Sequence, residues 1–328
     1  QWIGALTLYR VLDRMKSNPF KSLFTGRYRK REYHLFLAMA FIYLVLWLLV
    51  PKPAFWGVDN GFKYQGMKSF AERGSFQIPY KGIDIDPNGQ LRPIMKPFGV
   101  FNGQSQIPVF SAVFMLIGSV FYLVFGKIGP WLIPLFGGWL TLFAAWFLWI
   151  RHKRKEDGRL FLIMLGFGSP LLFYSLTLWE HSLAMACVVL AFSLVARSKE
   201  ETNNKFDIRN SSIAAILLTL AVMLRTESVI WIPIVIMFWK FTKRSRTSGH
   251  VFLFVSVIGL FLVLQINKLL TGIAIPLHVL SNMAGYRYVG FRGWNSMTID
   301  WSTVIINHIQ VFYSLVFEGF GSDIISII

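Results

Sequence analysis

The organisation of this chain is decided by the stretch Phe55-Trp-Gly-Val-Asp59-Asn-Gly-Phe-Lys63-Tyr-Gln-Gly-Met-Lys-Ser-Phe-Ala-Glu72-Arg-Gly74, which follows the first long apolar run, 35–50. The near-helical spacing of its apolar residues predicts a helix that Asp59 can cap and Gly74 can end. A carboxylate this close to a predicted membrane exit lies near the level of lipid headgroup phosphates. Asp59 is therefore a candidate reactive carboxylate; the alternative is that it only caps the helix.

Composition places the chain among polytopic helical membrane proteins. Hydrophobic residues make up 55% of the sequence and aromatic residues 16%, which is outside the range of ordinary soluble domains. Several apolar runs approach the roughly 20 residues that cross a bilayer core. The segment 1–35 has no early apolar run with a cleavage site, so we expect no cleavable signal peptide. The one cysteine, Cys187, excludes a disulfide framework.

The net charge of +17 raises the question of a nucleic-acid partner, but the basic residues cluster beside the apolar runs. This distribution is typical of the positive-inside rule and predicts anionic membrane lipids, not nucleic acid, as partners. The basic segment 1–32 is expected to be cytoplasmic. It forms either an amphipathic helix on the membrane or a solvated tail.

The predicted fold is all-α, a membrane bundle of about seven transmembrane helices with a large first extracytoplasmic loop, 52–130, that carries interfacial helices. The transmembrane core is 33–268. The segment 269–328 is expected outside, with an amphipathic helix at 304–318, and its abrupt apolar end suggests a longer parent protein. The predicted spans are 33–50, 131–150, 160–178, 182–196, 211–224, 229–241 and 251–264.

One apolar stretch, 107–126, is long enough to span but is expected to lie along or dip into the outer interface. If it crossed, the basic run 151–155 would fall outside, against the positive-inside rule. The predicted spans 211–224 and 229–241 are too short to cover the core, at about 1.5 Å per residue. We therefore expect Arg225 and Glu227 to be drawn into the outer half of the membrane.

This topology predicts that charged residues from distant parts of the chain share the outer face. Ionisable groups at membrane depth usually mark function, and carboxylates beside Arg and Lys suit transfer from a phospholipid-linked donor. Each residue also has a structural alternative, namely a helix cap, a turn-closing ion pair or a snorkelling lysine. There is no P-loop, HExxH or CxxC motif, so nucleotide-driven transport and zinc hydrolysis lack support. The candidates are Asp59, Lys63, Arg92, Lys96, Glu180, His181, Arg225 and Glu227.

The order of these features resembles the GT-C membrane glycosyltransferases, such as the protein O-mannosyltransferases and the bacterial aminoarabinose transferases. The resemblance rests on Val58-Asp59-Asn60, Lys96-Pro97 before an apolar loop helix, Trp179-Glu180-His181 at a later outer turn, and Asn267-Lys-Leu-Leu-Thr-Gly272. It covers most of the chain through degenerate motifs. Asn60 stands where many members have a second acidic residue, and Glu180-His181 replaces the more usual aspartate.

The resemblance implies an integral protein of a bacterial or archaeal plasma (inner) membrane, with a cytoplasmic N-terminus. It implies transfer of a sugar from a polyprenyl-phosphate donor to an acceptor, with Asp59 as general base and inversion at the sugar carbon. The donor phosphate would be held by Arg92, Lys96 and Arg225, with Lys63, Glu227 and His181 as further substrate-binding candidates. Glu180 would orient the acceptor or bind a divalent cation, Mg²⁺ or Mn²⁺, together with Asp59 and His181. The segment 269–323 would be a substrate-covering loop.

Two other classes of protein fit the same sequence. A non-catalytic scaffold subunit of a larger membrane complex would keep the architecture, and Asn60 favours it. A lipid or solute transporter would need access from both sides, yet the predicted helices carry almost no ionisable residue at the midplane. Loss of function on changing Asp59 distinguishes the enzyme from the scaffold.

Overall fold

A computed structural model describes residues 27–53, 55, 57–88, 91, 98–101, 104–151, 158–195, 204–241, 246–272 and 274–277. This part of the chain is mostly helical and contains one small sheet. It divides into two compact units. Of the described residues, the first comprises those within 27–52, 134–221 and 228–256, and the second comprises those within 53–133, 222–227 and 257–277.

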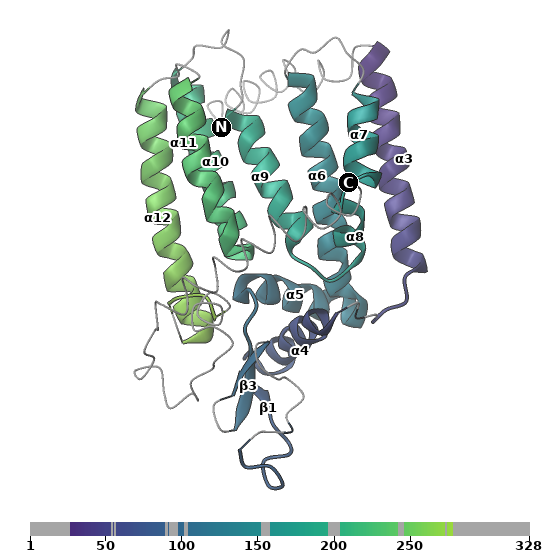
Figure 1. Cartoon of the computed structure of the whole chain (residues 1–328), viewed down its shortest axis with the longest axis vertical. Coiled ribbons are helices and arrows are strands. Elements are labelled where there is room, and N and C mark those ends of the chain that lie inside the picture. Colours follow the sequence, from purple (N-terminus) through teal and green to yellow (C-terminus); the bar gives the residue numbers. More distant parts are fainter. Residues whose placement is uncertain are drawn as a thin grey trace, which may run out of the picture. The chain divides into compact units, whose positions relative to one another are not determined.

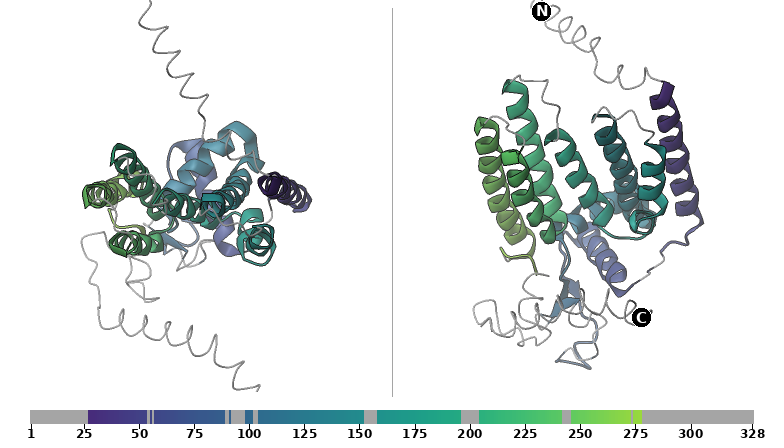
Figure 2. Two further views of the ribbon diagram at one scale, coloured as in Figure 1. Left: turned by 90° about the horizontal axis from the view of Figure 1, so that it is seen from above. Right: turned by 45° about the horizontal axis from the view of Figure 1, so that its top comes forward.

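The first unit is helical in its described part, and its helices run side by side (Figures 1 and 2). Helix α3 packs against α7 and α8, and α9 packs against α8 and α11. The last residues of α10 and the second half of α12 belong to the other unit. The helices are α3 (Arg27–Leu49), α6 (Leu132–Arg151), α7 (Arg159–Phe167), α8 (Leu171–Leu176), α9 (His181–Val195), α10 (Asn204–Leu224), α11 (Trp231–Phe241) and α12 (Arg246–Thr271).

Four helical stretches of the described chain are long and apolar enough to cross a membrane: Glu32–Leu49, Ala112–Trp149, Asp207–Leu224 and Arg246–Thr271. Large apolar side chains point outward along α3 and α12, among them Phe41 at 65% and Phe254 at 67% exposure, as expected of surfaces that meet lipid. The prediction of a helical membrane protein agrees with this. The predicted number of seven spans is not confirmed, because α9 and α11 are apolar but shorter.

Several predicted spans have the wrong bounds. Helix α12, for example, extends beyond the predicted span 251–264 at both ends. The predicted helix 160–178 is broken between α7 and α8 at Gly168–Pro170, because proline has no N–H to continue the helical ladder. The predicted helix 211–224 starts earlier, since α10 has 21 residues and is about 32 Å long. That length covers a bilayer core, so shortness of this helix gives no reason for Arg225 to be drawn into the membrane.

Small residues let the helices of the first unit approach closely. A Cβ at Gly137 of α6 would lie 2.5 Å from the backbone N of Leu183 in α9. Ser182 Oγ donates to the Pro134 carbonyl, and Thr141 Oγ1 donates to the Ser182 carbonyl, both at 2.9 Å. Close backbones joined by hydroxyl hydrogen bonds are typical of helix contacts inside membranes.

A buried carboxylate joins three elements of the same unit. Glu32 of α3 is 4% exposed, and its two oxygens accept from Trp146 Nε1 at 3.3 Å and from the Gly158 N–H at 2.9 Å. Gly158 is the N-cap of α7, whose free N–H groups favour a negative charge. Glu32 therefore links α3 and α6 to the start of α7.

We expect Glu32→Ala to lower the free energy of unfolding by about 2–3 kcal/mol, because it leaves two buried donors without their acceptor. Thermal unfolding in detergent, followed by tryptophan fluorescence, measures this loss. Glu72→Ala is the control, because Glu72 is exposed and pairs only with Lys68 among the ion pairs described, at 3.9 Å. Equal melting temperatures for the two variants would show that Glu32 does not hold the helices together.

The second unit is built around helix α4 (Val58–Arg73), which confirms the helix predicted after the first apolar run. It ends as predicted at Gly74, whose φ of 68° is left-handed and whose N–H donates to the Phe70 carbonyl at 2.8 Å. Its N-cap is Gly57, so the reading of Asp59 as N-cap is wrong; Asp59 lies inside the first turn.

Helix α4 crosses α5 (Ala112–Phe125) through a reciprocal contact (Figure 1). A Cβ at Gly66 of α4 would lie 2.5 Å from Met115 Sδ, and one at Gly118 of α5 would lie 2.3 Å from Met67 Sδ. Each helix thus offers a glycine to a methionine of the other. Ser119 Oγ adds a hydrogen bond to the Met67 carbonyl at 2.9 Å.

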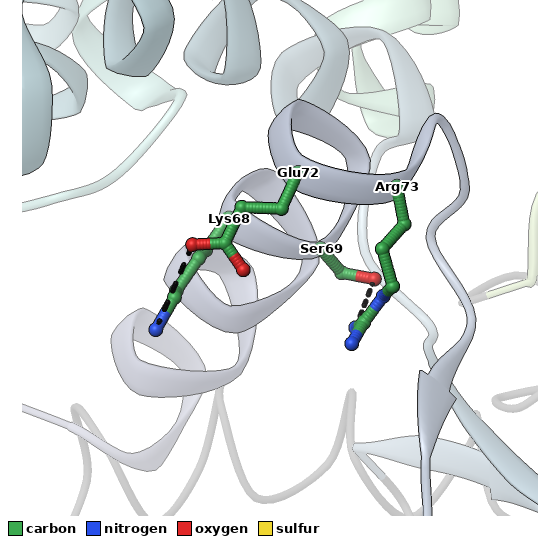
Figure 3. Close-up of polar contacts among 4 residues, drawn as sticks. All are labelled: Lys68, Ser69, Glu72 and Arg73. Atoms are coloured by element: carbon green, nitrogen blue, oxygen red, sulfur yellow. Dashed lines mark hydrogen bonds and ion pairs between the residues drawn. The ribbon is translucent and has the colours of Figure 1, made fainter.

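The far end of α4 is tied to a small antiparallel sheet that the sequence did not predict. The strands β1 (Ile78–Pro79), β2 (Gly99–Phe101) and β3 (Ser105–Pro108) pair in the order β1-β3-β2. Ser69 Oγ lies 2.8 Å from the Gln77 carbonyl and accepts from Arg73 at 2.7 Å. The neighbouring residues Lys68 and Glu72 form an ion pair on the same turns of α4 (Figure 3). Because β3 ends at Pro108, the apolar stretch 107–126 begins in this strand and not in a helix.

Helix α5 has 14 residues and is about 21 Å long, shorter than a bilayer core of about 30 Å. Gly126 has a left-handed φ of 66° and begins the 3₁₀ helix η1 (Gly126–Trp131). A Cβ at Gly129 would lie 2.0 Å from the Phe121 carbonyl oxygen, so η1 turns back against α5. The apolar stretch from Ala112 is thus not one straight helix. The length of α5 agrees with the predicted non-spanning helix, whose place in a membrane stays a prediction.

Candidate functional site

Asp59 and Lys63 lie on one face of α4, because residues four apart in a helix are neighbours. Asp59 is half-buried in the first turn, where the free backbone N–H groups favour a carboxylate. The N-cap Gly57 offers no side-chain cap to these groups. The start of α4 thus presents a carboxylate with a cation one turn further on.

Lys63 is buried, with 1% of its surface exposed. Its Nζ lies 4.8 Å from the centre of the Phe110 ring and 5.9 Å from that of Phe114, distances at which an aromatic face attracts a cation. Burying a lysine is costly in free energy. A buried ammonium beside a half-buried carboxylate is therefore a strong candidate for a functional pair.

Ser111 connects this helix face to the segment that carries Arg225. Its Oγ accepts from the Phe114 N–H at 3.1 Å, which caps α5, and donates to the Met223 carbonyl at 2.7 Å. This bond holds the segment 222–227 at the start of α5. Ser111 directly follows Phe110, whose ring contacts Lys63. The same compact unit thus contains four of the predicted site residues, Asp59, Lys63, Arg225 and Glu227.

Arg225 and Glu227 form an ion pair of 3.1 Å at the turn between α10 and the 3₁₀ helix η2 (Thr226–Ile230). Their side chains are 27% and 63% exposed. The alternative reading of these residues as a turn-closing pair is confirmed. Exposed pairs of this kind contribute little to stability. The role of Arg225 as a phosphate ligand stays a prediction.

Glu180 and His181 belong to the first unit. Glu180 is buried and its carbonyl accepts from the Ala184 N–H at 2.9 Å, at the start of α9. The His181 ring stacks on Tyr174, with centroids 4.1 Å apart at 12°, and meets Trp179 edge-on at 4.8 Å. The predicted association of Glu180 and His181 with Asp59 concerns two units that are described separately, and it stays a prediction.

Several predicted features lie outside the described residues. These are Arg92 and Lys96, the basic segment 1–26, and the loop 278–328 with its helix at 304–318. Among the residues that the structure does describe, no three of His, Cys, Asp and Glu form a group that could hold a metal ion.

The structure adds residues that the sequence did not single out. Phe110 and Ser111 are part of the candidate site. Ser111 could have been noticed in the sequence, because a serine before an apolar run is an N-cap signal. Tyr64 follows Lys63 on α4, and burial raises its pKa to about 12, with smaller contributions from Tyr122 and Glu72. The Tyr64 phenol is therefore protonated near neutral pH.

No protein-family model, no curated protein and no solved structure matches this chain.

Proposed function

We propose that this protein is a membrane glycosyltransferase that moves a sugar from a polyprenyl-phosphate donor to a hydroxyl acceptor at the outer membrane face. The observation that carries the proposal is the buried ammonium of Lys63 one helical turn from the Asp59 carboxylate. The helix that bears both follows a candidate membrane span. A base and a cation at this level suit an acceptor hydroxyl and a departing lipid phosphate.

In the proposed reaction, Asp59 takes the proton of the acceptor hydroxyl. The hydroxyl oxygen attacks the anomeric carbon of the sugar from the face opposite the phosphate, and the bond from that carbon to the phosphate oxygen breaks. The polyprenyl phosphate leaves with the bonding electrons, so the configuration inverts. Lys63 and Arg225 stabilise the negative charge on this phosphate.

The proposal includes the GT-C architecture that the sequence resembles, with about seven spans and a cytoplasmic N-terminus. Helices α9 and α11 would then be short spans, and α7 with α8 one broken span. Support comes from the apolar character of these helices and from the shortness of α5. Anionic lipids would contact the basic cytoplasmic segments.

Lys63→Met is expected to weaken binding of polyprenyl phosphate to the purified protein in nanodiscs by about tenfold or more, because one charge-assisted hydrogen bond is lost. Methionine keeps the length and apolar stem of the side chain, so the fold should tolerate it. Lys68→Met is the matched control, since Lys68 lies on the same helix with 42% of its side chain exposed.

If Lys63→Met and Lys68→Met bind polyprenyl phosphate as the unchanged protein does, Lys63 is a packed structural residue and the carrying observation is lost. If the unchanged protein binds no polyprenyl phosphate at all, the protein is not an enzyme of this class. A scaffold subunit predicts that second result.

A further inference from the structure

Asn60 is an unusual residue in this structure. It is fully buried, at 0% exposure, yet no described residue offers a hydrogen bond to its amide nitrogen or its amide oxygen. Buried polar groups without partners are rare and cost free energy. An apolar residue of the same size would stabilise this position, so Asn60 has to be explained by something other than the stability of the fold.

The position of Asn60 relates it to the proposed site. It follows Asp59 in the first turns of α4 and lies three residues before the buried Lys63, on the same side of the helix. Its backbone N–H is already used, because it donates to the Gly57 carbonyl at 3.1 Å. The amide side chain is thus the polar group that is still unsatisfied between the candidate base and the candidate phosphate ligand.

The chemistry of an amide restricts what can satisfy it. The oxygen needs a donor and the nitrogen needs an acceptor. A phosphate or carboxylate would satisfy only the nitrogen, and an ammonium only the oxygen. A hydroxyl group both donates and accepts, and neighbouring hydroxyls on a sugar ring can bond both ends of the amide at once.

We propose that Asn60 is a specificity-determining residue that binds hydroxyl groups of the transferred sugar, and that this sugar is uncharged where it meets α4. The inference rests on the proposed function and deepens it. The amide is neutral, and the ammonium of Lys63 one turn away repels a second cation, so an aminosugar with its ammonium group at this place is disfavoured.

The glycines on either side of Asn60 have open space beside them. A Cβ at Gly57 would meet nothing within 4 Å, and one at Gly61 would meet only the ring of Phe55, at 3.8 Å. Phe55 is itself 43% exposed. Binding of the sugar requires a movement of the first turn of α4 that exposes the amide, and the open space at both glycines leaves room for it.

The test is Asn60→Leu in the full chain, reconstituted in nanodiscs, with two probes: undecaprenyl phosphate and undecaprenyl-phosphate-glucose. Leucine has nearly the same size and no polar group, so we expect the melting temperature to rise by about 2–4 °C. We expect the variant to bind the glucose-bearing lipid roughly 10- to 100-fold more weakly, because two hydrogen bonds are lost. Binding of undecaprenyl phosphate should not change.

Asn210→Leu is the matched control. Asn210 of α10 is 4% exposed and its amide nitrogen also lacks a partner among the described residues, but it lies in the other compact unit. This variant should bind both lipids as the unchanged protein does.

The inference is overturned if Asn60→Leu binds both lipids as the unchanged protein does, which would mean that only a buried water satisfies the amide. It is also overturned if binding of both lipids falls equally, because the residue would then act on the phosphate or the fold. In both cases the unchanged protein still binds undecaprenyl phosphate, so the proposed function stands. Failure of the unchanged protein to bind either lipid overturns both.

Discussion

Asp59→Asn is expected to reduce sugar transfer by about 10²–10⁴-fold, the usual contribution of a positioned general base. Asparagine has nearly the same shape as aspartate but cannot take a proton from the acceptor hydroxyl. The fold should be retained, because Asp59 is only half-buried and is not the N-cap of α4. The measurement is the initial rate of sugar transfer from a polyprenyl-phosphate donor, with the melting temperature recorded on the same sample.

The control for this variant is Glu72→Gln. Glu72 is an exposed carboxylate on the same helix and pairs with Lys68 (Figure 3). The Glu72→Gln variant should therefore transfer sugar at the unchanged rate. Full activity of Asp59→Asn would remove Asp59 from the mechanism. A scaffold subunit would show no transfer in any variant.

Gly137→Ala is expected to lower the free energy of unfolding by about 1–3 kcal/mol, because it forces two helices apart. The added methyl group would lie 2.5 Å from the backbone N and 2.9 Å from the Cα of Leu183. These are backbone atoms, so no side-chain rotation relieves the overlap and α6 has to move away from α9. That movement also lengthens the hydrogen bonds that Ser182 and Thr141 make across the contact, both 2.9 Å long.

Gly249→Ala in α12 is the control, measured by the same thermal unfolding in detergent. A Cβ at Gly249 would meet nothing within 4 Å, and alanine has the higher helix propensity, so this variant should gain up to about 1 kcal/mol. The contact between α6 and α9 is not as close as described if both variants are equally stable.

The start and end of α4 show which helix bounds the local sequence can predict. Gly74 ends the helix as predicted, because a left-handed residue is a property of a few neighbouring residues. The prediction of Asp59 as N-cap was wrong by two residues, since the N-cap is Gly57. Both residue types are favoured at an N-cap, so residue type alone does not decide between the two positions. Helix bounds within a few residues depend on such contacts and not on periodicity.

Contacts between segments far apart in the chain could not be predicted from the sequence. Lys63 was a candidate, but its burial against Phe110 depends on a contact between segments far apart in the chain. The hydrogen bond from Ser111 to the Met223 carbonyl spans 112 positions, and the unsatisfied amide of Asn60 follows from packing alone. The small sheet was missed because its two- to four-residue strands carry almost no periodic signal.

The sequence by itself determined that this protein is helical, apolar enough for a membrane, and organised around a helix that starts soon after the first long apolar run. Chain length and hydropathy decide these features, and both are properties of local segments. Only the tertiary structure decided which face of α4 is buried. It also decided where the predicted helix 160–178 divides into α7 and α8, and which segment Ser111 hydrogen-bonds. Those outcomes depend on which distant residues fill the space beside each element, and that choice is made by packing.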